Sequence, residues 1–351
     1  MHMADALLSP EVGGTMWAAS AGTIAYCSAK VRRELDDRKV PLMGVLGAFL
    51  FAAQMINFTI PGTGSSGHLG GGLLLTILLG PYAAFLTIAS VLVVQALFFA
   101  DGGLLALGCN IINMGFFPAF IVYPLIYKRL IGTNPSRGRL TAVTILSAMI
   151  GLQLGPLGVV LETVFSGISS LPFSTFVLLM LPIHLAIGAV EGLITVAIVS
   201  FVQQARPDIL QSIQEARPVG NRGVRRLVFA FLAAAVLTGG IVSWFASERP
   251  DGLEWAIQKV TGRTELATSH EKVHQALAAL QEKTAILPDY GFKAQAKPEG
   301  AYAGAPAAST ARGQSSEGRI GTSISGLIGA LLTLGIAFLS GYLLKRRNQR
   351  A

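Results

Sequence analysis

The sequence predicts an all-α polytopic membrane protein with about nine transmembrane helices. Of its 351 residues, 52% are hydrophobic and 13% are charged, whereas about 25% of the residues of an average soluble domain are charged. The apolar residues are gathered in runs of roughly 20, the length that crosses a bilayer as a helix. Lys and Arg are concentrated in alternate loops between these runs, as membrane topology requires.

Nine apolar segments are candidates for membrane spans. They lie at 13–31, 41–57, 69–80, 82–100, 107–130, 140–165, 174–203, 225–246 and 320–344. The segment at 69–80 is short and rich in glycine. We therefore expect a broken or partly re-entrant helix there, which is tolerated only where it is buried among other helices.

The basic residues set the expected orientation. Eighteen of the 27 Lys and Arg lie in four loops, at 30–39, 128–139, 203–226 and 345–350. The short loops at 57–68, 101–106 and 166–173 carry none. The positive-inside rule therefore predicts an N-terminus outside the cell membrane and a C-terminus in the cytoplasm. The net charge of +8 is explained by cytoplasmic loops that face anionic membrane lipid, and it requires no nucleic acid.

The chain divides into two predicted modules. We expect a membrane domain of seven spans at 1–205, a basic cytoplasmic linker at 206–224, and a second module at 225–351 with two spans around a long outside segment. Within that segment, residues 264–285 have the spacing of an amphipathic helix that lies on the membrane or on the first module. Its apolar face is predicted from Leu266, Val273, Leu277 and Leu280. Residues 294–319 are rich in Ala, Gly, Pro and Ser, and we expect a flexible loop.

The first two residues form a potential metal chelator. The free amine of Met1, the backbone nitrogen of His2 and the His2 imidazole Nδ1 can close a five-membered and a six-membered ring around one ion. A planar set of nitrogen ligands that includes a deprotonated amide favours Ni(II) or Cu(II) over calcium, magnesium and manganese. Met1 is expected to be retained, because the aminopeptidase that removes it requires a small second residue. The alternative is that a Met-His start is a coincidence.

His68 is the candidate fourth ligand. It follows an uncharged, glycine-rich loop on the same predicted side as the N-terminus. Together with the chelate it would complete a planar site of four nitrogens, and Asp5 or Glu162 could compensate the remaining charge. Polar residues near His68 could donate hydrogen bonds that orient the imidazoles, or could instead satisfy the loop backbone. They are Gln54, Asn57, Thr63, Ser65 and Ser66.

Two further pairs of ionisable residues have helical spacing. His184 and Glu191 are seven residues apart and share one face of a predicted span. Ionisable groups inside a membrane are usually functional, and we expect these two to pair through another helix, with a proton relay as the alternative. His270 and His274 could bind a metal at i,i+4 spacing, but no carboxylate or Cys completes that site. The pattern therefore favours a solvated helix face.

Small residues recur at four-residue spacing in the second span, at Gly44, Ala48 and Ala52. This stripe permits close helix contact inside a bilayer, either within the protein or with a separate membrane partner.

Cys27 and Cys109 lie inside predicted spans, and we interpret them as packing residues.

The sequence contains no Walker A phosphate loop, no His-Glu-x-x-His motif and no Gly-x-Ser-x-Gly motif. We therefore expect a protein that is not an enzyme and that has no ATPase of its own.

Three segments carry a resemblance to a known family. The sequences MHMADALLSP at 1–10, QMINF and SGHL within 54–69, and HLAIGAVEG at 184–192 together resemble the CbiM/NikM family, the substrate-capturing components of energy-coupling-factor (ECF) transporters for cobalt and nickel. RPDGLEWA at 249–256 resembles the Pro-Asp-Gly-Leu-Glu signature of the small companion proteins CbiN/NikN, here fused to the first module. The resemblance implies a seven-helix substrate component.

The resemblance also implies ligands and partners. The ion would be held by Met1, His2 and His68, and the partners would be a transmembrane coupling protein and cytoplasmic ATPases. The stripe of small residues defined above would be the docking surface for the coupling protein. The implied function is ATP-driven import of Ni(II) or Co(II) across the cell inner membrane, with nickel favoured by the planar chelate and no cofactor besides the transported ion. The alternative is an independent secondary carrier or channel for the same ions, without an ATPase.

Overall fold

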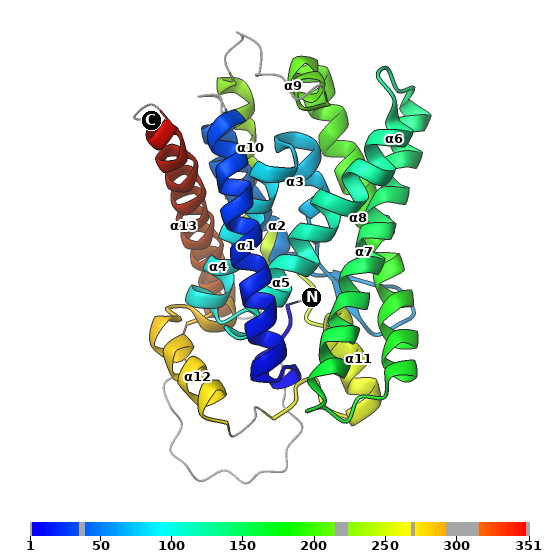
Figure 1. Ribbon diagram of the computed structural model, residues 1–351, viewed down its shortest axis with the longest axis vertical. Coiled ribbons are helices and arrows are strands. Elements are labelled where there is room, and N and C mark those ends of the chain that lie inside the picture. Colours follow the sequence, from blue (N-terminus) through cyan, green and yellow to red (C-terminus); the bar gives the residue numbers. More distant parts are fainter. Residues whose placement is uncertain (1, 35–38, 215–223, 268–270, 293–315, 349–351) are drawn as a thin grey trace.

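The protein is a bundle of helices with a single two-stranded hairpin among the residues described (Figure 1). The computed structural model describes residues 2–34, 39–214, 224–267, 271–292 and 316–348. Most helices run along the long axis of the molecule and bury apolar residues between them. The predicted all-α polytopic class is confirmed.

Every predicted span of the first module coincides with helical structure. The helices of this part are α1 (Pro10–Glu34), α2 (Lys39–Gln54), α3 (Gly72–Leu79), α4 (Pro81–Phe99), α5 (Leu107–Ile111), α6 (Lys128–Ile131), α7 (Arg137–Ser166), α8 (Phe173–Ala205) and α9 (Pro207–Gln214). A short 3-10 turn, η1 (Asp5–Leu7), precedes α1. A π-helical stretch, η2 (Ile112–Tyr127), joins α5 to α6 and contains two prolines, which cannot donate to a regular α-helical ladder.

The third predicted span is a short helix that follows a hairpin. Helix α3 has 8 residues, all buried, and a helix of that length extends only about 12 Å. It is preceded by residues 55–71, which we call the hairpin loop. In this loop β1 (Phe58–Thr59) pairs antiparallel with β2 (Ser66–Gly67). The turn between the strands uses positive φ at Gly62 and Gly64, which only glycine adopts without strain.

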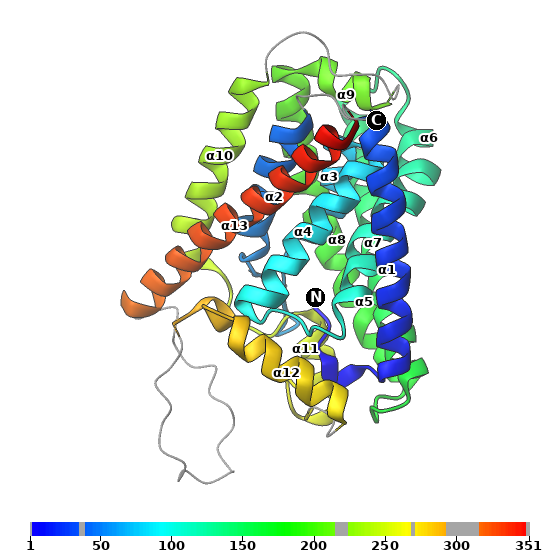
Figure 2. The same ribbon diagram turned by 60° about the vertical axis from the view of Figure 1, so that its left-hand side comes forward.

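The second module packs against the first. Its elements are α10 (Arg225–Gly240), η3 (Val242–Phe245), α11 (Gly252–Thr261), α12 (Lys272–Thr284), η4 (Pro288–Tyr290) and α13 (Ser316–Asn348). Helices α10 and α13 lie against α2, and α12 crosses beneath α4 at the lower end of the molecule (Figure 2). The structure thus places α11 and α12 at the end of the molecule where α1 begins.

Five helical segments within the described part of the chain are long and apolar enough to cross a membrane. They are Pro81–Phe99, Leu107–Ile131, Arg137–Ser166, Phe173–Ala205 and Gly318–Arg346. The other four predicted spans correspond to α1, α2, α3 and α10. Of these, α2 and α10 have 16 residues each, or about 24 Å, which is shorter than a hydrocarbon core of roughly 30 Å. The count of nine spans therefore remains a prediction.

The stripe of small residues on α2 is covered by the chain itself. A Cβ atom at Gly44 would lie 3.2 Å from the Leu334 carbonyl oxygen and 3.3 Å from Phe338 Cβ, both on α13. Ala48 and Ala52 are buried. A separate coupling protein has no access to this stripe, so its predicted docking role is corrected: the small residues let two helices of the same chain approach closely.

Candidate metal centre

The N-terminal segment is held inside the bundle by backbone hydrogen bonds. The Met3 nitrogen donates to Asn110 Oδ1 at 2.8 Å, and the Gly103 nitrogen donates to the Met3 carbonyl oxygen at 3.0 Å. Asp5 Oδ1 accepts a hydrogen bond from the Ala106 nitrogen at 2.9 Å. Met3 is fully buried. Met1, a predicted ligand, lies outside the described residues.

Two glycines shape the groove that receives this segment. A Cβ atom at Gly102 would lie 3.2 Å from His2 Cβ and 2.9 Å from Asn110 Nδ2. At Gly103 it would lie 2.5 Å from the Asp5 backbone nitrogen and closer still to the Asp5 carboxylate. Any larger residue at either position would press on the inserted segment. Neither glycine was singled out in the sequence, where they resemble ordinary turn residues.

His2 is oriented by an acidic residue that the sequence did not reveal. Its Nδ1 lies 3.0 Å from Asp101 Oδ1, and the His2 side chain is 6% exposed. The other oxygen of Asp101 accepts a hydrogen bond from the hydroxyl of Tyr290, in the second module. Burial alone would raise the pKa of the Asp101 carboxyl group. The facing His2 ring and the Tyr290 hydrogen bond nevertheless hold this pKa well below its usual range.

This contact departs from the predicted chelate. The chelate uses His2 Nδ1, which here faces Asp101, whereas Nε2 has no hydrogen-bond partner among the described residues. Metal binding through Nδ1 would therefore require the ring to turn about its Cβ–Cγ bond and to release the carboxylate. Asp101 would then be close enough to offset the positive charge of the site, the role predicted for Asp5 or Glu162.

His68 lies directly beside His2. Their rings are stacked, with centroids 5.0 Å apart and planes 7° from parallel. His68 Nδ1 lies 3.0 Å from the Leu69 carbonyl oxygen. A carbonyl only accepts, so Nδ1 carries the proton and Nε2 carries the lone pair. Burial lowers the pKa of His68 to about 3, which keeps the ring in the neutral form that binds metals.

The hairpin loop is fixed to the bundle by buried polar side chains. Gln54 Nε2 donates to the Gly70 carbonyl oxygen at 2.9 Å. The carboxylate of Glu191, on α8, accepts from the nitrogens of Gly70 and Gly71 at 2.6 and 3.2 Å. These bonds hold the backbone that follows His68.

The polar residues predicted to orient the imidazoles hold the loop backbone instead. The Ser65 hydroxyl donates to the Ser66 and Pro250 carbonyl oxygens, at 3.1 and 3.4 Å, and Thr63 Oγ1 donates to the Ile60 carbonyl oxygen at 2.9 Å. Gln54 does the same at Gly70, as described. His2 Nδ1 faces Asp101, and His68 Nδ1 faces the Leu69 carbonyl oxygen. The side chains of Gln54, Thr63 and Ser65 bond to backbone of the loop, which favours the alternative interpretation for these three residues.

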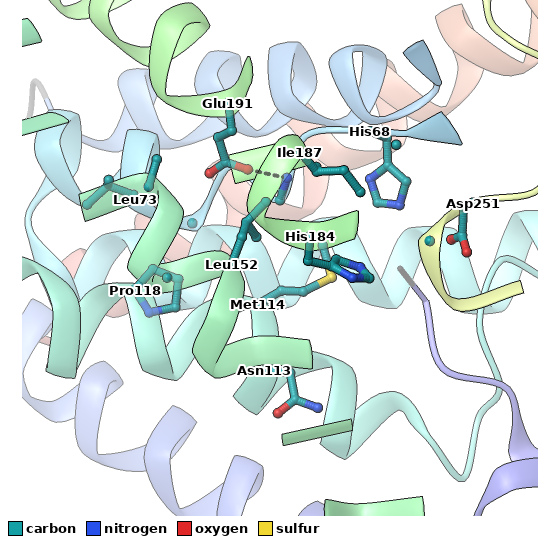
Figure 3. A pocket seen from close by; sticks show the side chains of 16 residues that line it. His68, Leu73, Asn113, Met114, Pro118, Leu152, His184, Ile187, Glu191 and Asp251 are labelled. Atoms are coloured by element: carbon teal, nitrogen blue, oxygen red, sulfur yellow. Dashed lines mark hydrogen bonds between the residues drawn. The ribbon is translucent and has the colours of Figure 1, made fainter. Parts of the chain in front are cut away.

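The second module is bonded to the hairpin loop along one edge. The Ser66 nitrogen donates to the Pro250 carbonyl oxygen at 2.8 Å, and the Ser66 hydroxyl donates to the Arg249 carbonyl oxygen at 2.7 Å. Trp255 Nε1 donates to the Thr63 carbonyl oxygen at 3.0 Å. The first turn of α11 is closed by a capping box between Asp251 and Glu254, and Asp251 lines the same cavity as His68 (Figure 3).

His184 and Glu191 do not pair with each other. Glu191 is occupied by the hairpin loop, and His184 Nδ1 lies 2.7 Å from the Met180 carbonyl oxygen, one turn earlier on α8. Glu162, a candidate for charge compensation, accepts a hydrogen bond from Asn113 Nδ2 at 2.8 Å. Glu191 is therefore bonded to the backbone of another segment and His184 Nδ1 to its own helix, so the two side chains do not pair with each other.

His274 is not on a solvated face. It is fully buried, and its Nε2 lies 2.9 Å from the Leu8 carbonyl oxygen. Helix α12 thus docks on the first module through His274 and Gln281. Of the predicted apolar face, Leu266 and Leu277 pack against the buried core, whereas Val273 and Leu280 are exposed. His270 lies outside the described residues. Cys27 and Cys109 are buried and form no disulfide, as expected of packing residues.

The side chains alone do not complete a metal site. Within the described ranges, no group of three or more His, Cys, Asp or Glu residues could hold an ion. The predicted site, which adds the Met1 amine and the His2 amide nitrogen to the two imidazoles, stays a prediction. Nitrogen-rich planar coordination of that kind suits Ni(II) or Cu(II).

Comparison with known proteins places both halves of the chain. The family described as "Cobalt uptake substrate-specific transmembrane region" (CbiM) matches residues 2–209, and the PDGLE domain family matches residues 225–346. The putative fused nickel transport protein NikMN of Archaeoglobus fulgidus is 34% identical over 253 residues, which cover 70% of this chain and 77% of that protein.

Other relatives agree. The probable fused nickel transport protein LarMN of Lactiplantibacillus plantarum is 30% identical over 78% of this chain and 83% of its own. The cobalt transport protein CbiM of Sorangium cellulosum is 31% identical over 62% of this chain and 97% of its own. A crystal structure described as a transition metal transporter, 29% identical, superposes with a TM-score of 0.52 over 60% of this chain and 97% of that one.

Proposed function

The chain belongs to the CbiM family and carries a fused PDGLE domain, and on that premise we propose that it is the metal-capturing membrane subunit of a transporter for Ni(II) or Co(II). The ion is captured by the Met1 amine, the His2 amide and imidazole, and the His68 imidazole. The protein is a transporter subunit and not an enzyme, and the ion is its cargo. The relatives that cover both modules are named as nickel transport proteins, which favours nickel.

One observation carries the proposal. His2 and His68 belong to segments 66 residues apart, yet their rings stack inside the bundle at a centroid distance of 5.0 Å. Two imidazoles at such a place are not required for packing, since apolar residues would fill the space without burying polar nitrogens. Their convergence beside the start of the chain supports capture of a transition metal.

The second module stabilises both ligand-bearing segments. Tyr290 holds Asp101, which holds His2. At the other side, residues 249–255 bond to the hairpin loop that carries His68. We propose that these contacts order the site for metal entry, and that the module boundaries at 205 and 225 separate capture from this supporting role.

We propose that transport is driven by ATP hydrolysis in cytoplasmic partner proteins, joined to this chain by a transmembrane coupling protein. The chain would lie in the cell inner membrane with its N-terminus outside and its C-terminus in the cytoplasm, in line with the charge pattern. One feature also fits an independent carrier: α3 is short and begins at Gly72, which lines the same cavity as His68, and carriers often have a broken helix beside the binding site.

Uptake of radioactive nickel separates these two possibilities. Cells that produce the full chain alone would be compared with cells that also produce the coupling protein and the ATPases, and with cells whose ATPase has a disabled Walker A lysine. We expect accumulation only with active ATPases. Equal accumulation by the chain alone would contradict the coupled mechanism and establish the carrier.

A further inference from the structure

His184 has a nitrogen for which the proposed capture site gives no role. The ring is 1% exposed, and its Nδ1 is held by the Met180 carbonyl oxygen. A carbonyl only accepts, so Nδ1 carries the proton and the lone pair lies on Nε2. Within the part of the chain that the structure describes, Nε2 has no hydrogen-bond partner. A buried, unpaired acceptor is costly unless something binds it.

The His184 side chain lines a small cavity beside the capture site. The cavity holds about 30 Å³, room for about one or two water-sized groups. Its wall includes His68 from the hairpin loop, His184 and Glu191 from α8, Met114 from η2, and Asp251 from the second module. In Figure 3 the His184 ring extends from α8 toward Asp251. Two imidazoles and a thioether suit a transition-metal cation, and the carboxylates of Glu191 and Asp251, which accept backbone hydrogen bonds, add negative charge to the wall.

The second module fits closely over the His184 ring. A Cβ atom at Gly252 would lie 2.7 Å from His184 Cε1 and 3.1 Å from His184 Nε2. Only glycine leaves the ring its present position. The first residue of α11 therefore forms the wall of the cavity at the unpaired nitrogen.

We propose that His184 Nε2 is an additional donor for the transported ion, an inference that rests on the proposed capture function. His184 Nε2 binds the ion while the ion moves from the planar chelate into the cavity. Ligand exchange at a four-coordinate planar ion proceeds through a state with one more ligand. A neutral imidazole beside the site supplies that ligand without closing the site permanently. The cavity groups do not converge on a common point as a resident metal site does, which fits brief occupancy.

His184→Gln tests this role in the full-length protein with its native N-terminus. The matched control is Leu185→Ala, because Leu185 neighbours His184 on α8 but is 44% exposed. We expect His184→Gln to bind nickel with nearly wild-type affinity, which also shows that it folds. We expect it to release nickel to excess chelator about tenfold more slowly, and to support about tenfold less nickel uptake in cells with the ATPases, as loss of a supporting metal contact does. Gly252→Ala should reproduce the slow release by displacing the ring.

A second measurement probes the donor directly. In His68→Ala protein, which keeps the Met1 and His2 donors, Co(II) added alone at high concentration should give weak binding with visible absorption, and the His68→Ala/His184→Gln double variant should bind Co(II) about tenfold more weakly. Unchanged release and uptake in His184→Gln, or equal Co(II) binding by the single and the double variant, would overturn the proposal. A loss of affinity in His184→Gln as large as in His68→Ala would overturn it too, since His184 would then be a resident ligand. Failure of the wild-type protein to bind nickel would refute the capture function itself.

Discussion

Gly103 forms the wall against which the inserted N-terminal segment rests, so Gly103→Ala tests the insertion without changing any proposed ligand. The added methyl group would lie 2.5 Å from the Asp5 nitrogen, closer than side chains approach backbone atoms. The φ angle of Gly103 is not positive, so alanine is acceptable in the backbone and the effect is steric. Residues 3–5 must shift by about 1 Å or more, whereas a site of this kind tolerates about 0.5 Å.

The expected magnitude follows from the hydrogen bonds that such a shift breaks. The bond from the Ala106 nitrogen to Asp5 involves a charged acceptor, and the bond from Met3 to Asn110 is neutral. Together they contribute about 2–4 kcal/mol, which corresponds to a ~30- to ~1,000-fold rise in the apparent Kd for nickel.

Isothermal titration of untagged protein with Ni(II) measures this change. Gly14→Ala is the control, because Gly14 lies near the start of α1 and a Cβ atom there meets nothing within 4 Å. That variant should bind nickel like the wild type. If Gly103→Ala also bound within about threefold of the wild type, a difference of less than 1 kcal/mol, the N-terminal segment would not be part of the site.

Other perturbations address separate parts of the centre. One residue added before Met1 should abolish high-affinity nickel binding, because the terminal amine loses its chelate position; a calorimetric titration that matched the native form would exclude the amine as a ligand. His68→Ala should raise the Kd for nickel by at least ~100-fold, because losing even a residue that only supports a metal ligand can cost that much. Equilibrium dialysis measures this Kd, and a smaller rise would contradict the role of His68 as a ligand. Asp101→Asn should weaken binding by ~10-fold, because the site loses the carboxylate that offsets its positive charge; unchanged binding would exclude that role. Trp255→Phe removes one hydrogen bond to Thr63, so amide exchange in the hairpin loop should speed up about fivefold; an unchanged rate would show that the second module does not order this loop.

The long helices were predictable because each consists of one apolar run with clear ends. The predicted span at 82–100 corresponds to α4, Pro81–Phe99, which begins at a proline after a glycine with positive φ. The span at 174–203 corresponds to α8, Phe173–Ala205, which follows Pro172. Proline at a helix start and an uninterrupted apolar run are local signals.

The contacts between distant segments were not predictable in the same way. Asp101 and Tyr290 are 189 residues apart, and neither stands in a pattern that marks it as a partner of His2. The stripe on α2 signals a close helix neighbour, but its spacing does not say whether that neighbour is another protein or α13. His274 shows the same limit, because a histidine that bonds a buried carbonyl has no sequence signature that separates it from a solvated one.

The candidate ligands themselves were predictable because their chemistry is local. A terminal amine, an adjacent amide and an imidazole at residue two form chelate rings whatever the fold, and His68 stands alone in an uncharged loop. What the sequence left open was whether the two segments meet. The stacking of His2 on His68 shows that they do.

The central claim is that the N-terminus captures a metal ion, and metal content with visible absorption tests it most directly. Purified full-length protein with a native N-terminus would be incubated with Ni(II), separated from free ion and analysed. The account predicts one equivalent of nickel and the yellow absorption of a planar nitrogen site. Protein without bound nickel, or nickel with an octahedral spectrum that does not depend on Met1 and His2, would contradict it.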